Sequence, residues 1–488
     1  MRVQPHRFDP DPMRRFRNVH FVGVGGAGMS GIAEVMLNLG YRVTGSDISE
    51  SPAVSRLQRL GAEVFIGHHA NNVAQANVVV CSSAIDPENP ELVQARELRI
   101  PIVPRAEMLG ELMRLRHGIA VAGTHGKTTT TSLIASVLAE GEMDPTFVIG
   151  GLLNSLGSSA RLGEGSYLVA EADESDGSFL LLQPTIAVVT NIDNDHLEHY
   201  DHDFERLRAS FLEFLHHLPF YGMAILCLDN PVVEGLIPEV TRSVVTYGLS
   251  PDADFWADNL RQSGSVMRFD AHIPKREGPL EIELSLPGRH NVLNALAAMA
   301  VAWELGVDEA AVQRALSSFQ GIGRRFNVHG ELAFPGGRAL FVDDYGHHPT
   351  ELAATLEAAR EGWPDRRLVA VFQPHRYSRT RDLMDDFAQV LSGVDALVLA
   401  EVYAAGEPAL AGADGRGLSR AIRARGQVDP VFVSRAQDIP AVLPGVMRDG
   451  DLVLLLGAGD IGSVAAALYA NGFAESAGAS PGEVAGAN

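Results

Sequence analysis

Lysine is nearly absent from this chain. Of its 39 basic residues, two are lysine, Lys127 and Lys275, and all the others are arginine. The planar fork of arginine does not replace a compact ammonium charge among phosphates. A lysine in such a chain therefore indicates that its ammonium group is required for function. Lys127 lies in a glycine-containing segment on which much of the functional prediction below depends.

Other absences exclude whole classes of protein. The two cysteines, Cys81 and Cys227, lie in apolar runs, which predicts buried, inert thiols and excludes a disulfide framework. No run approaches the ~18 apolar residues of a membrane-spanning helix, and residues 1–16 contain no apolar signal-peptide core. We therefore expect a cytoplasmic protein without membrane insertion. Sequence alone leaves the oligomeric state open, with a monomer or a weak homodimer expected.

Charge and histidine spacing exclude two further functions. The net charge is −22 and no basic stripe occurs, which argues against nucleic acid as a partner. Anionic small substrates stay open, because a few arginines and Mg²⁺ can reverse the sign of the potential within a pocket. The paired histidines lack H-x-x-x-H or C-x-x-C spacing, so zinc is not expected.

The length of 488 residues is too great for one core. We predict an α/β fold of three domains: an N-terminal Rossmann-like domain over 17–107, a central P-loop ATPase-like domain with a mostly parallel sheet over 108–326, and a C-terminal Rossmann-like domain over 327–470. Segments 1–16 and 471–488 are expected to be flexible tails.

A phosphate-binding loop is predicted in the central domain. An apolar strand over 119–122 runs into Gly123-Thr124-His125-Gly126-Lys127-Thr128-Thr129, and apolar residues then recur at helical spacing. Backbone N–H groups and a helix N-terminus would surround one point, which suits phosphate. Lys127 would reach the outer phosphates and Thr128 would hold Mg²⁺. The usual spacing requires glycine at 121, where this chain has Val121.

The N-terminal domain has the order of a dinucleotide-binding unit. A strand over 19–24 leads into a glycine-rich turn at 23–31, and a second strand over 41–45 ends at Asp47, an acid suited to a ribose hydroxyl. The same turn holds any diphosphate, including that of a UDP-sugar. Ser82–Ile85 leaves the carboxyl end of another strand, where such sheets bind ligands. His68 and His69 are either ligand contacts or solvated loop residues.

Two acidic clusters follow strands of the central domain. Glu171–Asp176 comes after a strand over 167–170, and Asn191–His196 comes after a strand over 186–190. The carboxyl ends of parallel strands converge on one crevice. Oxygen and imidazole ligands beside a phosphate loop predict a Mg²⁺ site.

Polar clusters also mark the remaining chain. His290 and Asn294 open an apolar helix, where they suit either a base or a helix cap. Arg324 and Arg325 form a hinge pair suited to a phosphate or a carboxylate. In the third domain, strands over 339–342 and 368–372 end in Asp343–Thr350 and Gln373–Thr380.

With these residues in place, the sequence resembles the Mur ligase family. The motifs cover roughly residues 17 to 465 in order: GVGGAGMSG (23–31), SSAI (82–85), GTHGKTT (123–129), EADESD (171–176), NIDNDH (191–196), GRHNVLNA (288–295), GRRF (323–326), DDYGHHPTE (343–351), FQPHRYSRTRDL (372–383) and EVYAAGE (401–407). Within the family it resembles the branch that joins L-alanine to UDP-N-acetylmuramate in peptidoglycan precursor synthesis, which serves the cell wall, cell shape and cell division.

The resemblance implies one ligand for each domain. The UDP-sugar would contact Gly25, Gly26, Gly28, Ser30, Asp47, Ser82, Ser83 and Ala84. ATP would contact Gly123, Thr124, His125, Gly126, Lys127, Thr128, Thr129, His290, Asn294, Arg325 and Asp344. Mg²⁺, two ions with Mn²⁺ as a substitute, would bind Thr128, Glu171 and His196. L-Alanine would contact Tyr345, His347, His375 and Arg376.

The implied reaction activates the lactyl carboxylate with ATP to an acyl phosphate, which the alanine amine attacks. Lys127, Glu171, His196, His347 and Arg376 are the expected catalytic residues, and no residue is identified as the base for the amine proton. Other Mur ligases carry a carbamylated lysine in the central domain. This chain has no lysine between Lys127 and Lys275, as in the alanine-adding branch.

Two alternatives remain. A recycling ligase attaches a murein tripeptide to the same sugar nucleotide, and its third-domain motif usually has Phe-Ala where this chain has Tyr345-Gly346. An NAD-linked sensor or dehydrogenase could be built on the first glycine turn, but it leaves the phosphate loop and both acidic clusters unexplained.

Overall fold

The computed structural model describes residues 16–82, 84–154, 158–195 and 197–476. Two predicted site residues, Ser83 and His196, lie outside the described residues, as does most of both expected tails. Residues 471–476, which we expected to belong to the C-terminal tail, lie in the helical segment α15 (Ile461–Ser476), whose backbone is kinked at Gly472. Within the described ranges, no helix combines the length and the apolar character needed to cross a membrane.

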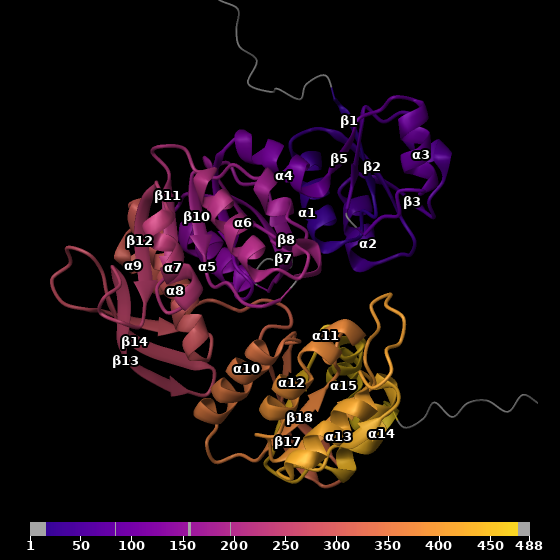
Figure 1. Cartoon of the computed structure of the whole chain (residues 1–488), viewed down its shortest axis with the longest axis vertical. Coiled ribbons are helices and arrows are strands. Elements are labelled where there is room, and N and C mark those ends of the chain that lie inside the picture. The colour runs from indigo at the N-terminus through magenta and orange to yellow at the C-terminus, as the bar shows by residue number, and fades with distance from the viewer. Residues whose placement is uncertain (1–15, 83, 155–157, 196, 477–488) are drawn as a thin grey trace, which may run out of the picture. The chain divides into compact units, whose positions relative to one another are not determined.

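The described residues form three mostly parallel sheets with helices between their strands (Figure 1), which confirms the predicted α/β fold class. They divide into two compact units. The first unit runs to Asp258 and includes Asp270–Ile282 and Leu293–Gln320. The second contains Asn259–Phe269, Glu283–Val292 and the chain from Gly321. The three predicted domain boundaries stay a prediction.

The first sheet has the order β3-β2-β1-β4-β5, and all its pairings are parallel. Its elements are β1 (Asn18–Val22), α1 (Ala27–Asn38), β2 (Arg42–Asp47), α2 (Pro52–Arg59), β3 (Glu63–Ile66), η1 (Ala70–Val73), β4 (Val78–Cys81), α3 (Pro90–Glu97) and β5 (Ile102–Pro104). β1 ends before the predicted Val24 because Gly23 turns the chain at a φ of +77°.

Alternation along β1 makes this a two-sided sheet. Val19 and Phe21 pack in one buried cluster with residues of α1 and α2, such as Ile32 and Val54. Val22 points to the other face and packs in a cluster that contains residues of α3. Because successive side chains of a strand face opposite ways, one apolar strand supports helices on both faces.

The second sheet has the order β15-β14-β13-β12-β11-β10-β6-β9-β7-β8. Its elements are β6 (His117–Ala122), α5 (Lys127–Glu140), β7 (Thr146–Leu153), β8 (Ser158–Arg161), β9 (Tyr167–Glu171), η2 (Ser178–Leu181), β10 (Ile186–Val189), η3 (Leu197–Tyr200), α6 (Phe204–His216), β11 (Met223–Cys227), α7 (Pro231–Leu236), η4 (Ile237–Glu239), β12 (Ser243–Gly248), β13 (Phe255–Ser263), β14 (Val266–His272), β15 (Leu280–Leu284), α8 (Arg289–Glu304) and α9 (Glu309–Ser317). β6 pairs in parallel with β10 on one side and β9 on the other, so the loops that follow these three strands leave the same edge.

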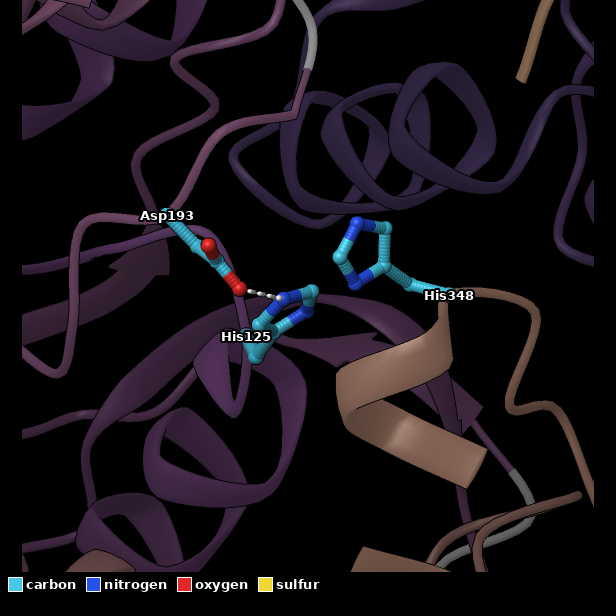
Figure 2. Close-up of side chains that lie close together, drawn as sticks. All are labelled: His125, Asp193 and His348. Carbon is cyan, nitrogen blue, oxygen red and sulfur yellow. Dashed lines mark hydrogen bonds and ion pairs between the residues drawn. The ribbon is translucent and has the colours of Figure 1, made fainter. Parts of the chain in front are cut away.

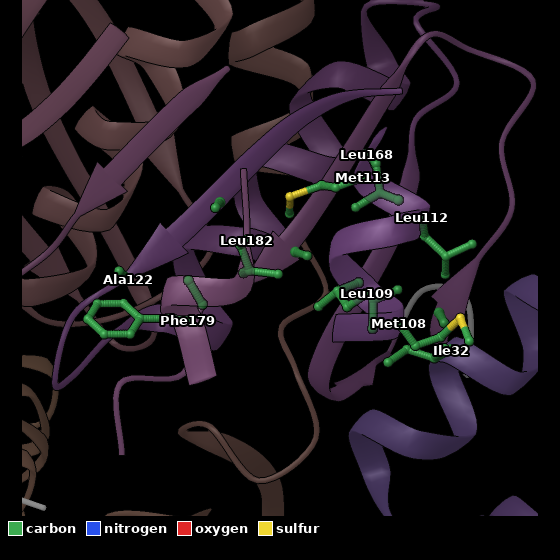
Figure 3. Packing of buried hydrophobic residues seen from close by; sticks show 14 of the residues in the cluster. Ile32, Met108, Leu109, Leu112, Met113, Ala122, Leu168, Phe179 and Leu182 are labelled. Atoms are coloured by element: carbon green, nitrogen blue, oxygen red, sulfur yellow. The ribbon is translucent and has the colours of Figure 1, made fainter. Parts of the chain in front are cut away.

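Helix α4 (Arg105–Arg114) joins the first sheet to the second. Its buried face carries Met108, Leu109, Leu112 and Met113, which belong to the same apolar cluster as Ile32 of α1 and residues of β6, β9 and η2 (Figure 3). The cores around the first two sheets are therefore continuous within the first unit.

The third sheet has the order β16-β17-β21-β18-β19-β20, with β16 and β17 antiparallel. Its elements are β16 (Asn327–Phe334), β17 (Gly337–Asp344), α10 (Pro349–Gly362), β18 (Leu368–Phe372), α11 (Tyr377–Asp382), α12 (Met384–Leu391), β19 (Ala396–Ala400), α13 (Gly415–Arg425), β20 (Val431–Val433), η5 (Ala436–Asp438), α14 (Ile439–Val442), η6 (Leu443–Gly445), β21 (Leu452–Leu456) and α15. One face packs with α10, α12 and α13, and the other with α14 and α15.

The close contact between α4 and η2 provides a test of this core. A Cβ at Gly110 would lie 2.8 Å from the backbone oxygen of Leu181, a clash that no rotamer change relieves. Gly110→Ala should therefore lower the thermal midpoint, by the equivalent of about 1–3 kcal/mol for overpacking. Gly235→Ala is the matched control in α7, where a Cβ meets nothing within 4 Å. It should leave the midpoint unchanged or raise it, and equal losses in both variants would contradict the packing.

Candidate active site

The phosphate loop connects β6 to α5, and its backbone requires glycine at two places. Gly123 and Gly126 have φ values of +133° and +83°, a region that residues with a Cβ rarely adopt. A Cβ at Gly123 would lie 2.0 Å from Thr190 Oγ1, and one at Gly126 would lie 2.8 Å from Asn294 Oδ1. The loop is thus pressed against β10 and α8, with its helix N-terminus formed as predicted.

Lys127, the first residue of α5, is held by carbonyl and carboxylate oxygens. Its Nζ donates to the backbone oxygens of Gly123 at 2.6 Å and Thr124 at 3.2 Å, and to both carboxylate oxygens of Glu174 at 3.0 and 2.8 Å. Burial acts to lower the pKa of Lys127, but the neighbouring carboxylates, Glu174 first, outweigh it and raise that pKa. The ammonium is therefore charged at the mouth of the loop.

Asn191 fixes the middle of the loop. Its Oδ1 accepts from the backbone N–H of His125 at 2.8 Å, and its Nδ2 donates to the backbone oxygen of His125 at 3.0 Å. Thr190 Oγ1 donates to that same oxygen at 2.6 Å. Sequence reasoning placed Asn191 in an acidic metal cluster and missed this role, which depends on the neighbouring position of β6 and β10.

His125 and Thr124 also contact the second acidic segment. The ring of His125 lies 3.3 Å from Asp193 Oδ2 (Figure 2), and Thr124 Oγ1 accepts from the backbone N–H of Asp193 at 2.9 Å. The predicted convergence of strand-end loops is therefore present here.

Two of the three predicted metal ligands are adjacent. Thr128 Oγ1 donates to Glu171 Oε2 at 3.2 Å, and Glu171 Oε1 accepts from the backbone N–H of Gly150 at 2.5 Å. A hydroxyl and a carboxylate oxygen at this separation are the hard ligands that Mg²⁺ prefers, so the described residues fit the ion. The third predicted ligand, His196, lies outside the described residues.

At the first sheet, the glycine turn and Asp47 lie together. Asp47 Oδ2 accepts from the backbone N–H of Gly25 at 2.8 Å, and the carbonyl of the preceding Ser46 accepts from Gly23 and Val24. A Cβ at Gly23 would lie 3.1 Å from Ile85, which brings the loop after β4, with Ser82 and Ala84, against the same turn. Ser30 is buried in α1, and its N–H donates to the carbonyl of Gly26.

Arg105, at the start of α4, was not predicted as a site residue. A Cβ at Gly28 would lie 2.5 Å from its guanidinium, and Arg105 also lies 3.8 Å from Asp173. It thus adds a positive charge between the first glycine turn and the 171–176 segment.

The buried carboxylate of Glu91 is hydrogen-bonded to Ser46, the residue whose carbonyl holds the first glycine turn. Glu91 of α3 accepts from Ser46 Oγ at 2.6 Å and from Asn72 Nδ2 at 2.5 Å, and lies 3.4 Å from His20 and 3.6 Å from His68. His68 is therefore tied to this network and is not a simply solvated loop residue. Glu91 gave no signal in the sequence, because its partners come from four separate segments.

In the second unit, Asp344 organises the backbone. Its carboxylate accepts from the N–H groups of Phe326 at 2.8 Å and Gly346 at 2.7 Å, and from Thr355 Oγ1 at 3.3 Å. Burial raises the pKa of Asp344 despite Arg325 nearby. Arg324, the other hinge arginine, donates to the carbonyl of Gly457 at 2.5 Å. Arg324 also lies 3.4 Å from the carboxylate of Asp343, and its role toward a phosphate or a substrate carboxylate stays a prediction.

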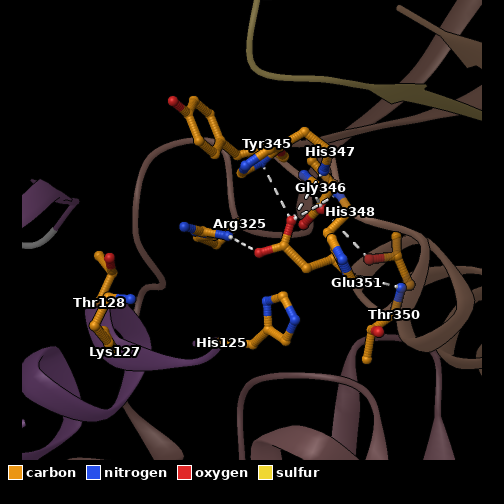
Figure 4. Close-up of polar contacts among 12 residues, drawn as sticks. His125, Lys127, Thr128, Arg325, Tyr345, Gly346, His347, His348, Thr350 and Glu351 are labelled. Carbon is orange, nitrogen blue, oxygen red and sulfur yellow. Dashed lines mark hydrogen bonds and ion pairs between the residues drawn. The ribbon is translucent and has the colours of Figure 1, made fainter. Parts of the chain in front are cut away.

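The predicted amino-acid residues form a row of rings (Figure 4 shows its first part). The ring centres of Tyr345 and His347 are 5.4 Å apart, those of His347 and His375 are 5.8 Å apart, and His375 stacks on Tyr403 at 5.4 Å. Burial lowers the pKa of His347 and that of His375 to about 4. Both rings are therefore neutral at pH 7.

Glu351 was missed as a site residue, although its motif was identified. It accepts from the N–H of His347 at 2.9 Å, closes a capping box with His348 at the start of α10, and lies 3.7 Å from Arg325 (Figure 4). A glutamate three residues after an N-cap is the sequence signal that could have found it.

Arg376 and the two remaining ATP candidates are placed as follows. Arg376 caps α11 with a φ of +69°, and its N–H donates to the Tyr403 carbonyl at 2.9 Å. Asn294 accepts from Thr130 Oγ1 of α5 at 3.1 Å. His290 lies in the second unit, half-buried, and its desolvation lowers its pKa to about 4.

A phosphate loop with an adjacent pair of oxygen ligands, at the carboxyl edge of parallel strands, is typical of a nucleotide-dependent enzyme. Three family models match this chain: Mur ligase family, catalytic domain, over residues 18–117, Mur ligase middle domain over 121–302, and Mur ligase, glutamate ligase domain, over 324–459.

Solved structures agree. The chain is similar to the UDP-N-acetylmuramate-alanine ligase of Thermotoga maritima at 30% identity and a TM-score of 0.79, covering 94% of this chain and 99% of that one. A murein peptide ligase of Psychrobacter arcticus matches at 26% identity and a TM-score of 0.67, covering 93% and 99%. A MurF ligase of Thermotoga maritima in complex with ADP, at 16% identity and a TM-score of 0.60, covering 89% and 95%, shares the fold. The chain belongs to the Mur ligase family and is an ATP-dependent ligase of peptidoglycan precursor synthesis.

The clamp on the phosphate loop gives a prediction. Asn191→Ala removes both hydrogen bonds to the His125 backbone, which is half-buried, a loss of about 2–3 kcal/mol. Nucleotide affinity should fall by roughly tenfold or more, measured by calorimetry with Mg-ADP. Asn194→Ala, an exposed position in the same segment, should bind as wild type. If Asn191→Ala keeps wild-type affinity, the side chain does not shape the loop.

Proposed function

We propose that this enzyme joins L-alanine to the lactyl carboxylate of UDP-N-acetylmuramate, with ATP converted to ADP and phosphate. ATP would lie on the loop from Gly123 to Thr129, with Mg²⁺ held by Thr128 and Glu171. A bound Mg²⁺ would neutralise charge on the phosphates during transfer. The UDP-sugar would occupy the turn at Gly25, Gly26 and Gly28. A cytoplasmic location remains part of the proposal.

The observation that carries the choice of alanine is the geometry at Gly346. Asp344 Oδ1 accepts from its N–H at 2.7 Å, and a Cβ at this position would lie 2.8 Å from that same oxygen. The Phe-Ala pair usual in the tripeptide-recycling ligases therefore does not fit this turn without a shift of Asp344. The similarity to an alanine ligase at 30% identity supports the same choice.

The chemistry would proceed through positioning and charge neutralisation. The carboxylate of the sugar attacks the terminal phosphorus of ATP, ADP leaves, and the resulting acyl phosphate is attacked by the amine of alanine. Phosphate leaves and the amine loses a proton. Lys127 would contact the phosphates, and the row of rings with Arg376 would receive the amino acid.

The direct test is to incubate the enzyme with Mg-ATP, UDP-N-acetylmuramate and either L-alanine or the murein tripeptide. We expect phosphate release, and a product heavier than UDP-N-acetylmuramate by one alanyl residue, in the reaction that contains alanine, and neither in the reaction that contains the tripeptide. Phosphate release with the tripeptide, and none with alanine, would favour the recycling reaction. Tight NAD binding without UDP-sugar binding would overturn both.

Arg376 provides a prediction at residue level. A guanidinium can hold the carboxylate of alanine through two parallel hydrogen bonds and so aim its amine. Arg376→Ala should lower kcat/KM for alanine by about 100-fold, equivalent to roughly 3 kcal/mol. The KM values for ATP and UDP-sugar should change less than about twofold.

Arg381→Ala is the matched control on the same helix, because Arg381 is exposed and donates to Asp382 at 2.7 Å. An exposed ion pair contributes about 0–1 kcal/mol, so this variant should turn over normally. Normal alanine kinetics in Arg376→Ala, or a loss of ATP affinity instead, would show that Arg376 is not the carboxylate anchor.

A further inference from the structure

Glu174 has no assigned role, yet it makes the closest charged contact to the phosphate-loop lysine. Both of its carboxylate oxygens accept from Lys127 Nζ, at 3.0 and 2.8 Å. The Glu174 side chain is 1% exposed and that of Lys127 is 15% exposed. This is a buried, two-pronged ion pair between the 171–176 segment and the N-terminus of α5.

Two hydrogen bonds hold the backbone of Glu174. The carbonyl of Glu174 accepts from the hydroxyl of Tyr200 at 2.5 Å and from the N–H of Gly177 at 3.0 Å. Burial raises the pKa of Tyr200, so the hydroxyl keeps its proton and donates. The backbone from which the Glu174 side chain extends is therefore held at two points.

The two carboxylate oxygens of Glu174 are negatively charged hydrogen-bond acceptors for the Lys127 ammonium, as phosphate oxygens would be. We propose that Glu174 is the counterion of Lys127 in the nucleotide-free enzyme and that phosphates of the bound nucleotide displace it. This inference rests on the proposed function, because it requires Lys127 to contact nucleotide phosphates. Glu174 is thus a positioning residue that sets nucleotide affinity through Lys127.

Linkage fixes the sign of the effect. An interaction that exists only in the free enzyme must be broken on binding, so it weakens nucleotide affinity. Its removal should therefore tighten binding while lowering the stability of the free enzyme, since a buried ammonium loses its partner. A residue that merely supports the loop would act in the opposite direction, because its loss would weaken binding.

The test compares Glu174→Gln with wild type by calorimetry with Mg-ADP, alongside thermal melting without nucleotide. Glutamine keeps the shape and removes the charge. We expect Kd to fall by about fivefold or more and the nucleotide-free midpoint to drop. The matched control is Asp176→Asn, which removes an equal charge from the same segment. Asp176 accepts from the N–H of Ser178 at 3.0 Å, and its variant should change Kd by less than about twofold.

Weaker or unchanged binding by Glu174→Gln, or an equal tightening in both variants, would overturn the inference. If Glu174→Gln does not fold, Lys127→Met is added to it. Recovery of folding would show that the unpaired ammonium caused the loss, and no recovery would overturn the pairing role. Failure of wild type to bind Mg-ADP would reject the proposed function itself, a result distinct from these.

Discussion

The burial of one ammonium group is the constraint on which the central sheet depends. Lys127 lies in a chain that otherwise uses arginine almost throughout, at a point where burial alone would lower its pKa. An unpaired buried charge is costly, so the fold must supply oxygen partners at fixed places. It does so from the loop's own carbonyls and from Glu174, which brings the segment after β9 beside the segment after β6. The strand order β10-β6-β9 also places Asn191, just after the end of β10, where its side chain hydrogen-bonds the backbone of His125 in the same loop.

Steric constraints on the backbone also shape the site, because at two positions a neighbouring side chain leaves no room for a Cβ atom. Gly123 has Thr190 directly against it, and Gly346 has the carboxylate of Asp344 against it. In each case the glycine lets a polar side chain approach the backbone and hold it, one in each compact unit. This packing therefore holds the loops at the ends of buried strands in fixed conformations.

Sequence patterns predicted much of the scaffold. The strand predicted over 368–372 has those bounds, and the strands predicted over 167–170 and 186–190 differ from β9 and β10 by one residue at the carboxyl end. Runs of apolar residues with turn residues at both ends leave little choice of strand bounds. Strands β13–β15 were not predicted, although Leu280–Leu284 alternates apolar and acidic residues with a period of two, a burial pattern that the structure shows.

The partners of the polar side chains could not be predicted in the same way. Glu174, Asn191 and Glu351 lie inside motifs that were identified, but their roles depend on which strand ends are neighbours and on backbone angles. Glu91 lies in no motif, and its contacts join α3 to β1, β2 and the loop after β3. Residues that can bind ligands or catalyse are recognisable in a sequence by their type and motif. The residues that hold them in position can be identified only once the strand order is known.

The central claim is that an ammonium at position 127 does what no guanidinium can do. Lys127→Arg keeps the charge and should keep the fold, checked by circular dichroism and thermal melting. The measurement is the rate of phosphate release from ATP with UDP-N-acetylmuramate and L-alanine present. We predict a loss of roughly 100-fold or more, because the bulkier fork cannot occupy the place between loop carbonyls and phosphates. A variant that folds and turns over within about threefold of wild type would contradict the account.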